Sequence, residues 1–369
     1  MEWQESTHST QKNWRSPLPL HPFQNGIYGK SGAAVPNSFM FSQSINLSNY
    51  SNYKIGGLAR YFYRAKNVEQ LIRSIEKARQ FQLPVFVLGG GTNLLISDEG
   101  FNGLVLKPEI NLLKTEGNII KVGAGVSVSQ LLNCVITKSL SGLEWAGGLP
   151  GTLGGAIRGN AGAFGGEIKD SIKEVVSLDI SGKRPKLVKR NNAQCKFGYR
   201  NSIFKMRDGK EIILEATLAI KKGDKKEIRD AAEEKIKYRQ ERQPLDYPNI
   251  GSIFKNVPLA QIIADLKAQI TQINSDTVRV SPRSSPRKSA FTAPMKTDPF
   301  PVVPTAYLIS ECGLKGVSRG GAMISPKHPN FIVNVLNAKA VDVKALINLV
   351  KLEVKKKFGV ELEEEIIYL

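Results

Sequence analysis

Two glycine-rich segments constrain this 369-residue chain more than any other feature of its sequence. The first, "LGGGTNLLI" (88–96), places three glycines directly after an apolar run. The second lies between Gly147 and Gly166 and carries seven further glycines together with Pro150 and Asn160. Glycine lets the backbone approach a ligand closely, and successive N–H groups form a nest that suits phosphate oxygens. One such loop is commonly a turn at a sheet corner. Two of them in one framework predict an extended, backbone-lined groove for a large phosphorylated cofactor.

The better known nucleotide-binding motifs do not account for these glycines. The first segment is not a G-x-G-x-x-G fingerprint, because "TNLLISDEGF" predicts a strand and a turn where that motif requires a helix. The stretch "YGKSG" (28–32) is similar to the end of a phosphate-binding P-loop. Gln24 stands where the first glycine of that motif is required, and no apolar strand precedes it. We therefore exclude both motifs.

Composition and cysteine use favour a cytoplasmic protein. The apolar fraction is 41% and the charged fraction 23%, which is typical of a soluble globular chain. No apolar run reaches the roughly 18 residues that a membrane span needs, and the N-terminus lacks the pattern of a secretory signal. Cys134, Cys195 and Cys312 are odd in number and widely spaced, so they indicate neither a disulfide framework nor a metal site.

The formal net charge of +19 favours polyanionic partners in general. The basic residues are dispersed, however, and no helix carries a dense basic stripe with interleaved aromatics. Nucleic-acid binding is therefore not favoured, and an ordinary basic surface is the better expectation.

The first part of the chain predicts a ligand-binding module of two α+β subdomains after a disordered extension over residues 1–48, which is rich in Ser, Asn, Gln and Pro. A helix follows Asn67 as N-cap, and a buried strand follows Pro84. From about residue 110, short strands predict a mostly antiparallel sheet. The module spans 49–224, with subdomains at about 49–109 and 110–224.

The remaining residues, 225–369, predict a smaller C-terminal α+β domain. It begins with a helix over Lys225–Arg242 and ends with a helix over about 341–357 and the strand "LEEEIIYL". Residues 271–300 are rich in Ser, Pro and Arg and lack periodicity, so we expect a flexible basic insertion there.

Two short segments carry candidate functional side chains. Ser252 lies in "NIGSIFKN", which we predict to be a strand. A nucleophilic serine needs a histidine base, and the chain has only three histidines, two of them near the N-terminus, so we expect another role for Ser252. In "KFGYRNSIFK", also a predicted strand, Tyr199 and Arg200 should face opposite ways, so that one of them enters a cleft. The run Glu363 to Glu365 is of a kind that is usually solvated.

Taken in order, these segments resemble one family, the UDP-N-acetylenolpyruvoylglucosamine reductases of bacterial cell-wall synthesis. The resemblance covers roughly 49–259 and 301–369, and includes "YKIGGLA", "LGGGTNLLI", "GLEWAGGLPGTLGGAIRGNAGAFGGEI", "FGYRNSIFK", "GSIFKN" and "LEEEI". It implies an FAD-binding module of the vanillyl-alcohol-oxidase type followed by a substrate domain. It further implies non-covalent FAD, NADPH as electron donor, and reduction of the enolpyruvyl ether of UDP-N-acetylglucosamine to UDP-N-acetylmuramate. "QPLDYPNIGS" looks like the subgroup that lacks an extra tyrosine-bearing loop.

The resemblance also implies the site residues. Arg200, Ser252 and Glu365 match the family's catalytic arginine, serine and glutamate, while Tyr199, Arg242 and Asn256 match substrate contacts. The matched cofactor loops comprise Gly89, Gly90, Gly91, Thr92, Asn93 and Leu94, then Gly147, Gly148, Pro150, Gly151, Thr152, Gly154, Gly155, Asn160 and Gly162.

The sequence departs from the family pattern at three places. Phe164 stands where tyrosine is usual, and residues 1–48 and 271–300 have no counterpart. We expect a monomer. Two alternatives remain open at this point: a flavin-dependent carbohydrate or alcohol oxidase of the same fold, and a flavoprotein-like scaffold without activity.

Overall fold

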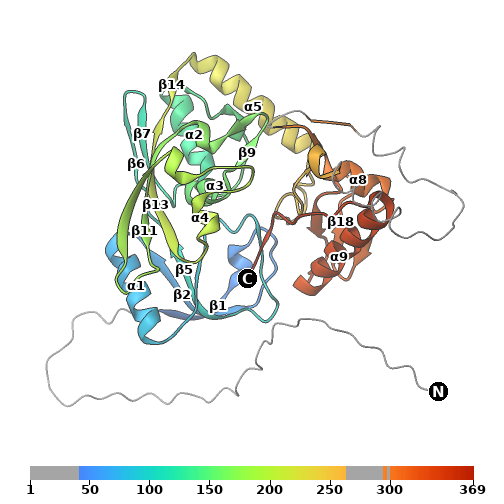
Figure 1. Ribbon diagram of the computed structural model, residues 1–369, viewed down its shortest axis with the longest axis horizontal. Coiled ribbons are helices and arrows are strands. Elements are labelled where there is room, and N and C mark those ends of the chain that lie inside the picture. The colour runs from blue at the N-terminus through green and yellow to red at the C-terminus, as the bar shows by residue number, and fades with distance from the viewer. Residues whose placement is uncertain (1–40, 263–293, 297–299) are drawn as a thin grey trace, which may run out of the picture. The chain divides into compact units, whose positions relative to one another are not determined.

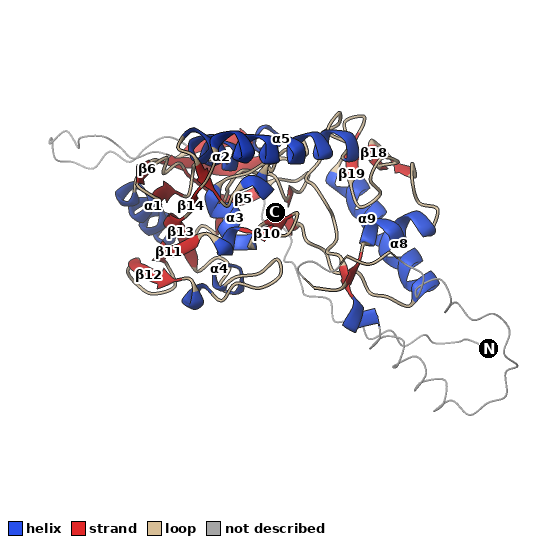
Figure 2. Cartoon of the chain, turned by 90° about the horizontal axis from the view of Figure 1, so that it is seen from above, coloured by secondary structure: helices blue, strands red, loops and turns tan. Residues whose placement is uncertain are grey.

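The computed structural model describes residues 41–262, 294–296 and 300–369. Most of the predicted extension (1–48) and of the predicted insertion (271–300) lies outside these ranges. Figure 1 shows the order of the elements along the chain, and Figure 2 shows how helices and strands are distributed. Within the described residues, no helix combines the length and apolarity needed to cross a membrane.

The first subdomain is a small mixed sheet with one helix on it. Its four-stranded sheet has the order β1-β2-β5-β3, in which β2 and β3 run parallel to β5 and β1 runs antiparallel to β2. The Asn67 side chain accepts a hydrogen bond from the Gln70 amide at 2.9 Å and caps the helix, as predicted. The elements are β1 (Ser42–Asn46), β2 (Leu58–Ala65), α1 (Val68–Gln80), β3 (Val85–Val87), β4 (Leu94–Leu95) and β5 (Phe101–Pro108).

Order begins earlier than the sequence suggested. β1 pairs with β2, and Leu47 in the following 3-10 turn is completely buried, so residues 41–48 belong to the fold. The prediction of disorder up to residue 48 is wrong for this part. The segment is short and mostly polar, and its few apolar side chains gain burial only when the neighbouring strand is in place.

The second subdomain is built on an antiparallel sheet, as predicted. The strand order is β12-β11-β13-β7-β6, and every pairing is antiparallel. A capping box between Ser127 and Gln130 begins α2. The elements are β6 (Leu113–Glu116), β7 (Ile119–Gly123), α2 (Val128–Thr137), β8 (Leu140–Ser141), α3 (Leu153–Gly159), β9 (Gly162–Ala163), β10 (Gly166–Glu167), β11 (Ile172–Asp179), β12 (Lys186–Asn191), α4 (Ile203–Met206), β13 (Glu211–Ala219) and β14 (Lys221–Lys222).

Helix α5 (Lys225–Arg242) has the predicted bounds but belongs to the second subdomain. Ala232 is buried in the core of that subdomain. A side chain at Gly147 would lie 2.3 Å from the Ala232 carbonyl, so the helix rests directly on the second glycine segment. The predicted domain boundary at 224/225 is therefore wrong, because the apolar residues of this helix pack against the preceding sheet domain. The C-terminal domain begins after Arg242.

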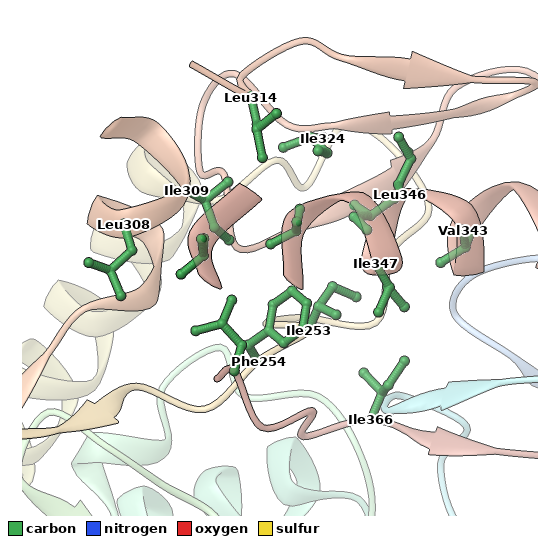
Figure 3. Close-up of a cluster of buried hydrophobic side chains, with 14 of the residues drawn as sticks. Ile253, Phe254, Leu308, Ile309, Leu314, Ile324, Val343, Leu346, Ile347 and Ile366 are labelled. Atoms are coloured by element: carbon green, nitrogen blue, oxygen red, sulfur yellow. The ribbon is translucent and has the colours of Figure 1, made fainter. Parts of the chain in front are cut away.

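In the C-terminal domain, α9 packs on a three-stranded sheet (β17-β18-β19) and α8 packs on α9. The apolar core that they form also includes Tyr53, Ile55 and Leu95 of the first subdomain. Figure 3 shows Leu308, Ile324 and Ile347 among the side chains that fill this core. The elements are β15 (Val257–Pro258), β16 (Val302–Val303), α8 (Thr305–Glu311), β17 (Ser318–Arg319), β18 (Ala322–Ile324), β19 (Ile332–Asn334), α9 (Ala340–Phe358) and β20 (Ile367–Tyr368).

The end of the chain returns to the first subdomain. β20 pairs in parallel with β4, directly after the first glycine loop. Asp98 accepts hydrogen bonds from the amides of Ala340 (2.9 Å) and Val341 (3.3 Å), at the start of α9. The buried hydroxyl of Tyr53 donates to the Ile332 carbonyl at 2.8 Å. These contacts join the C-terminal domain to the first subdomain beside the glycine loop.

Candidate active site

A cavity of about 1560 Å³ is lined by both glycine segments, α5 and residues of the C-terminal domain. Its size exceeds that of a typical small-molecule pocket of about 300–1,000 Å³. A cavity of this volume has room for one large ligand and a second ligand beside it.

The two glycine segments meet, although they are far apart in the sequence. A Cβ atom on Gly90 would lie 2.8 Å from the Cα of Gly151, and one on Gly151 would lie 3.1 Å from the Thr92 hydroxyl. Gly91 has φ +66°, and a Cβ there would lie 1.8 Å from the Tyr50 carbonyl oxygen. Side chains at Gly90 and Gly151 would therefore separate the two loops, and one at Gly91 would collide with the backbone of Tyr50, so glycine is required at these positions.

The first loop presents unpaired amides. Within the described residues, the backbone N–H groups of Gly89, Gly90, Gly91 and Thr92 donate no hydrogen bond. The Gly89 carbonyl accepts from the Lys107 ammonium at 2.9 Å, and the Gly91 carbonyl accepts from the Asn52 amide at 3.0 Å. The carbonyl groups are thus partly satisfied by the protein while the amides remain available. Such a nest fits the phosphate oxygens of a dinucleotide such as FAD.

Most of the predicted cofactor residues line this cavity. They are Gly89, Gly90, Gly91, Thr92, Asn93, Leu94, Gly148, Pro150, Gly151, Thr152, Gly154, Gly155 and Gly162.

Two predicted cofactor residues are not among the cavity-lining residues. Gly147 lies beneath α5, where its carbonyl accepts a hydrogen bond from Arg239 Nε at 2.8 Å. Asn160 is completely buried and has φ +44° at the end of α3. Its side-chain amide donates to the Gly198 carbonyl at 2.9 Å, so Asn160 joins the second glycine segment to the turn that carries Arg200.

Tyr199 and Arg200 lie on a tight turn, so the predicted strand is wrong here. Gly198 and Asn201 form an antiparallel bridge on either side of the pair, and Arg200 has φ +53°. Because the chain reverses, the alternation rule for strands does not apply, and both side chains line the cavity.

Arg200 joins the second subdomain to the C-terminal segment. Its Nε lies 2.7 Å from Oε1 of Glu365, and its Nη2 donates to the Gly162 carbonyl at 2.8 Å. Both charged side chains are about three-quarters buried, with exposures of 23% and 22%. Nη1 makes no hydrogen bond to a described residue and remains available for a ligand.

Ser252 lies in an extended loop and not in the regular strand that we predicted. The next two residues, Ile253 and Phe254, are buried in the C-terminal core, as Figure 3 shows. The Asn330 side chain bonds both the amide and the carbonyl of Phe254, at 3.0 and 2.8 Å. The amide of Glu365 donates to the Ile253 carbonyl at 2.8 Å, beside an isolated bridge between Phe254 and Glu364. The segments that carry Ser252 and Glu365 are therefore held side by side.

The predicted substrate contacts also line the cavity. The ring of Tyr199 lies edge-on to Phe300, with centroids 5.0 Å apart. Burial raises the pKa of the Tyr199 hydroxyl, and the Arg200 charge partly opposes this shift. The Asn256 side chain accepts from the Thr305 amide at 3.2 Å. The Arg242 guanidinium lies 5.7 Å from the centre of the Tyr238 ring.

One part of the cavity wall, which we call the α5 face, consists of Lys235, Tyr238, Arg239 and Arg242. The sequence reasoning found Arg242 but missed the other three. Their spacing of three, four and seven places them on one side of a helix, a signal that could have found them. Arg239 is buried, and its guanidinium lies 5.2 Å from the ring of Phe164. Burial lowers the pKa of Arg239, and the Arg200 charge adds to this effect.

Comparison with known proteins agrees with this site. Residues 243–369 match the model of the UDP-N-acetylenolpyruvoylglucosamine reductase C-terminal domain, and residues 59–184 match that of the FAD binding domain. The first of these matches begins directly after α5, where the packing places the boundary.

UDP-N-acetylenolpyruvoylglucosamine reductases of known sequence align with most of the chain. The UDP-N-acetylenolpyruvoylglucosamine reductase of Caldanaerobacter subterraneus subsp. tengcongensis is 36% identical over 321 residues, which is 87% of this chain and 90% of that protein. The enzyme of Lachnoclostridium phytofermentans is also 36% identical, over 87% of this chain and 90% of that protein. The crystal structure of UDP-N-acetylenolpyruvylglucosamine reductase from Thermus caldophilus has a TM-score of 0.65 and 27% identity, covering 89% of this chain and 98% of that one. The chain belongs to the UDP-N-acetylenolpyruvoylglucosamine reductase family.

Proposed function

We propose that this protein is an NADPH-dependent flavoenzyme that reduces the enolpyruvyl ether of UDP-N-acetylglucosamine to UDP-N-acetylmuramate, a step of peptidoglycan precursor synthesis. The observation that carries the proposal is the convergence of Arg200, Ser252 and Glu365 on a cavity whose other wall is a nest of glycine amides. Three free cysteines support a cytoplasmic location, and we propose that the protein acts as a monomer.

The chemistry sets clear demands on the protein. When FAD is bound, it supplies a hydride, received from NADPH, to the carbon β to the substrate carboxylate. Negative charge then develops over the α-carbon and the carboxylate as an enediolate. The site must stabilise this charge and must deliver one proton to the α-carbon.

Arg200 is suited to the first demand. Its Nη2 donates to the Gly162 carbonyl and its Nε pairs with Glu365 by charge, without a hydrogen bond between described residues, so two contacts orient the guanidinium before substrate binds. The free Nη1 can then face the developing charge without reorganisation. Glu365 orients the arginine through the ion pair, and it would stabilise the enediolate directly only in a protonated form.

Ser252 is suited to the second demand. His328 also lines the cavity, but within the described residues no hydrogen bond joins its ring to Ser252, and its Nδ1 has no partner. A serine hydroxyl is a weak acid in water, yet it can donate a proton to a strongly basic carbanion in a site shielded from water. The buried side chains of Ile253 and Phe254 fix the backbone directly after Ser252.

The charge of the cavity wall supports an anionic substrate. Burial lowers the pKa of both Arg239 and Lys205, which means that these cations are desolvated while they face the cavity. Desolvated cations that line a cavity favour a ligand that carries carboxylate or phosphate groups. A UDP-sugar with an enolpyruvyl carboxylate has both.

The two half-reactions provide the test. The purified protein should bind FAD, and NADPH should bleach the flavin absorption under anaerobic conditions. Addition of the enolpyruvyl substrate should restore the absorption and yield a product heavier by two hydrogens in mass spectrometry. Reduced flavin that reacts with oxygen but not with this substrate would contradict the proposal. Flavin that stays on the acid-precipitated chain would point instead to a tethered oxidase.

A further inference from the structure

Lys205 is a cavity residue to which the reaction described above assigns no role. It lies on α4, five positions after Arg200 in the sequence, and its side chain is only partly exposed. Its ammonium donates a hydrogen bond to the backbone carbonyl of Arg200 at 3.1 Å.

The backbone of Arg200 needs support. Its φ of +53° lies in the left-handed region, which a side chain with a Cβ disfavours. The turn is held at its ends, by the bridge between Gly198 and Asn201 and by the bond from Asn160 to the Gly198 carbonyl. Within the described residues, only Lys205 donates to the carbonyl of Arg200 itself. This one bond therefore acts on the peptide that follows the strained residue.

The ammonium of Lys205 is poorly compensated. No carboxylate of the described residues lies within ion-pair distance of it, whereas Arg158 is paired with Asp208 and Lys255 with Glu363. Burial lowers the pKa of Lys205, and the positive charges of Lys255 and Arg158 lower it further, while the charges of Glu365 and Glu363 act in the opposite direction. A partly buried cation without a counter-ion is costly to keep, so its retention here calls for a function.

We propose that Lys205 is a positioning residue, which holds the carbonyl of Arg200 and thereby keeps the guanidinium directed at Glu365 and at the substrate carboxylate. The inference rests on the function proposed above, since it assigns the step that Lys205 serves. Stabilisation of charge on the substrate should depend on Lys205, while FAD binding and reduction by NADPH should not.

Substitution by residues with and without a donor tests this role. Lys205→Met keeps the length of the side chain but removes the donor, and Lys205→Arg keeps a charged donor. Lys210→Met is the matched control, because Lys210 is exposed on the same segment. We expect Lys205→Met to slow reoxidation of the reduced flavin by the substrate about 10- to 100-fold, the range for loss of a charged hydrogen bond. Calorimetry should show weaker binding of UDP-N-acetylmuramate to the oxidised Lys205→Met enzyme, and Lys205→Arg should recover part of both losses.

A double-mutant cycle separates positioning from an independent effect. In an Arg200→Gln background, Lys205→Met should have little further effect on the reoxidation rate, because there is no guanidinium left to direct. Additive losses, or a Lys205→Met enzyme that reoxidises at the wild-type rate, would overturn the proposal. If Lys205→Met does not fold, Lys205→Gln takes its place in the same cycle. A wild-type enzyme that the substrate fails to reoxidise would refute the proposed function instead, so the two failures are distinguishable.

Discussion

Arg200 Nε lies 2.7 Å from Oε1 of Glu365, and this contact crosses from the second subdomain to the last segment of the chain. The amide of Glu365 is in turn bonded to the Ile253 carbonyl, one residue after Ser252. The three predicted catalytic residues are therefore connected by two contacts, although they come from three separate segments. We expect a substitution at one of them to change the position of the others.

Glu365→Gln should impair the second half-reaction while leaving FAD binding intact. The neutral amide can still accept a hydrogen bond but carries no negative charge, so Arg200 is left as a partly buried cation without its counter-ion. We expect the rate of flavin reoxidation by the enolpyruvyl substrate to fall about 10²-fold or more, in the range typical of lost charge stabilisation. Stopped-flow absorption spectroscopy measures this rate.

Glu363→Gln is the matched control for that experiment. Glu363 pairs with Lys255 and is itself 70% exposed, so water screens its charge, although the Lys255 side chain is only 14% exposed. Its rate should stay within a few-fold of wild type. Equal losses in the two variants would mean that the segment as a whole, and not the contact with Arg200, supports the reaction.

Ser252→Ala should leave FAD binding and oxidation of NADPH nearly unchanged. It should slow reoxidation of the flavin by the substrate by about 10²–10⁴-fold, the typical contribution of a general acid. Ser252→Cys keeps a transferable proton and should recover part of the rate. An alanine variant that reoxidises as fast as wild type would remove Ser252 from the mechanism.

Local patterns in the sequence predicted much of the fold. Periodicity and capping predicted the Asn67 cap and the helices α5 and α9, and the structure confirms all three. The glycine segments pointed to a backbone-lined groove, and the two loops do line one cavity. In each case the information lies within about twenty neighbouring residues.

What the sequence did not reveal depends on tertiary contacts. The strands expected around Arg200 and Ser252 are a turn and a loop, because bonds from Asn160 and Asn330 replace the ladder of a sheet. The assignment of α5 to the wrong domain also reflects tertiary contacts. The helical pattern shows which face of α5 is buried, but not which domain that face packs against. The role of Lys205 depends on a backbone conformation at Arg200 that an arginine does not signal, since a positive φ is common only for glycine and, less often, for asparagine and aspartate.

Asn160 should act on the Arg200 turn and not on the flavin. Asn160→Ala removes the bond to Gly198 and places alanine at φ +44°, so we expect a loss of about 2–3 kcal/mol in the free energy of unfolding. Asn160→Gly loses the same bond but tolerates the backbone angle, and should therefore lose less. Urea unfolding measures both values.

The same variants distinguish this role from a cofactor contact. The dissociation constant for FAD should change little in Asn160→Gly, while flavin reoxidation by the substrate should slow. A large loss of FAD affinity with an unchanged reoxidation rate would show that Asn160 serves the cofactor, as the family resemblance implied.

His328 should make the protein less stable in mild acid. Burial lowers its pKa to about 4, and the nearby Lys296 charge acts in the same direction. The unfolded chain binds a proton at this histidine near pH 6.5, whereas the folded protein does so only near pH 4. This contribution to stability is therefore fully present above about pH 6.5 and decreases as the pH falls to about 4, by roughly 3 kcal/mol at about 1.4 kcal/mol per pKa unit. His328→Gln cannot titrate, while the carboxylates that also respond to acid are the same in both proteins. Urea unfolding can be measured at pH 7.5, 5.5 and 4.5, that is, from about one unit above to about two units below the ordinary histidine pKa. The free energy of unfolding should decline more steeply with falling pH for wild type than for the variant. Parallel declines would show that His328 is protonated as readily in the folded protein as in the unfolded chain.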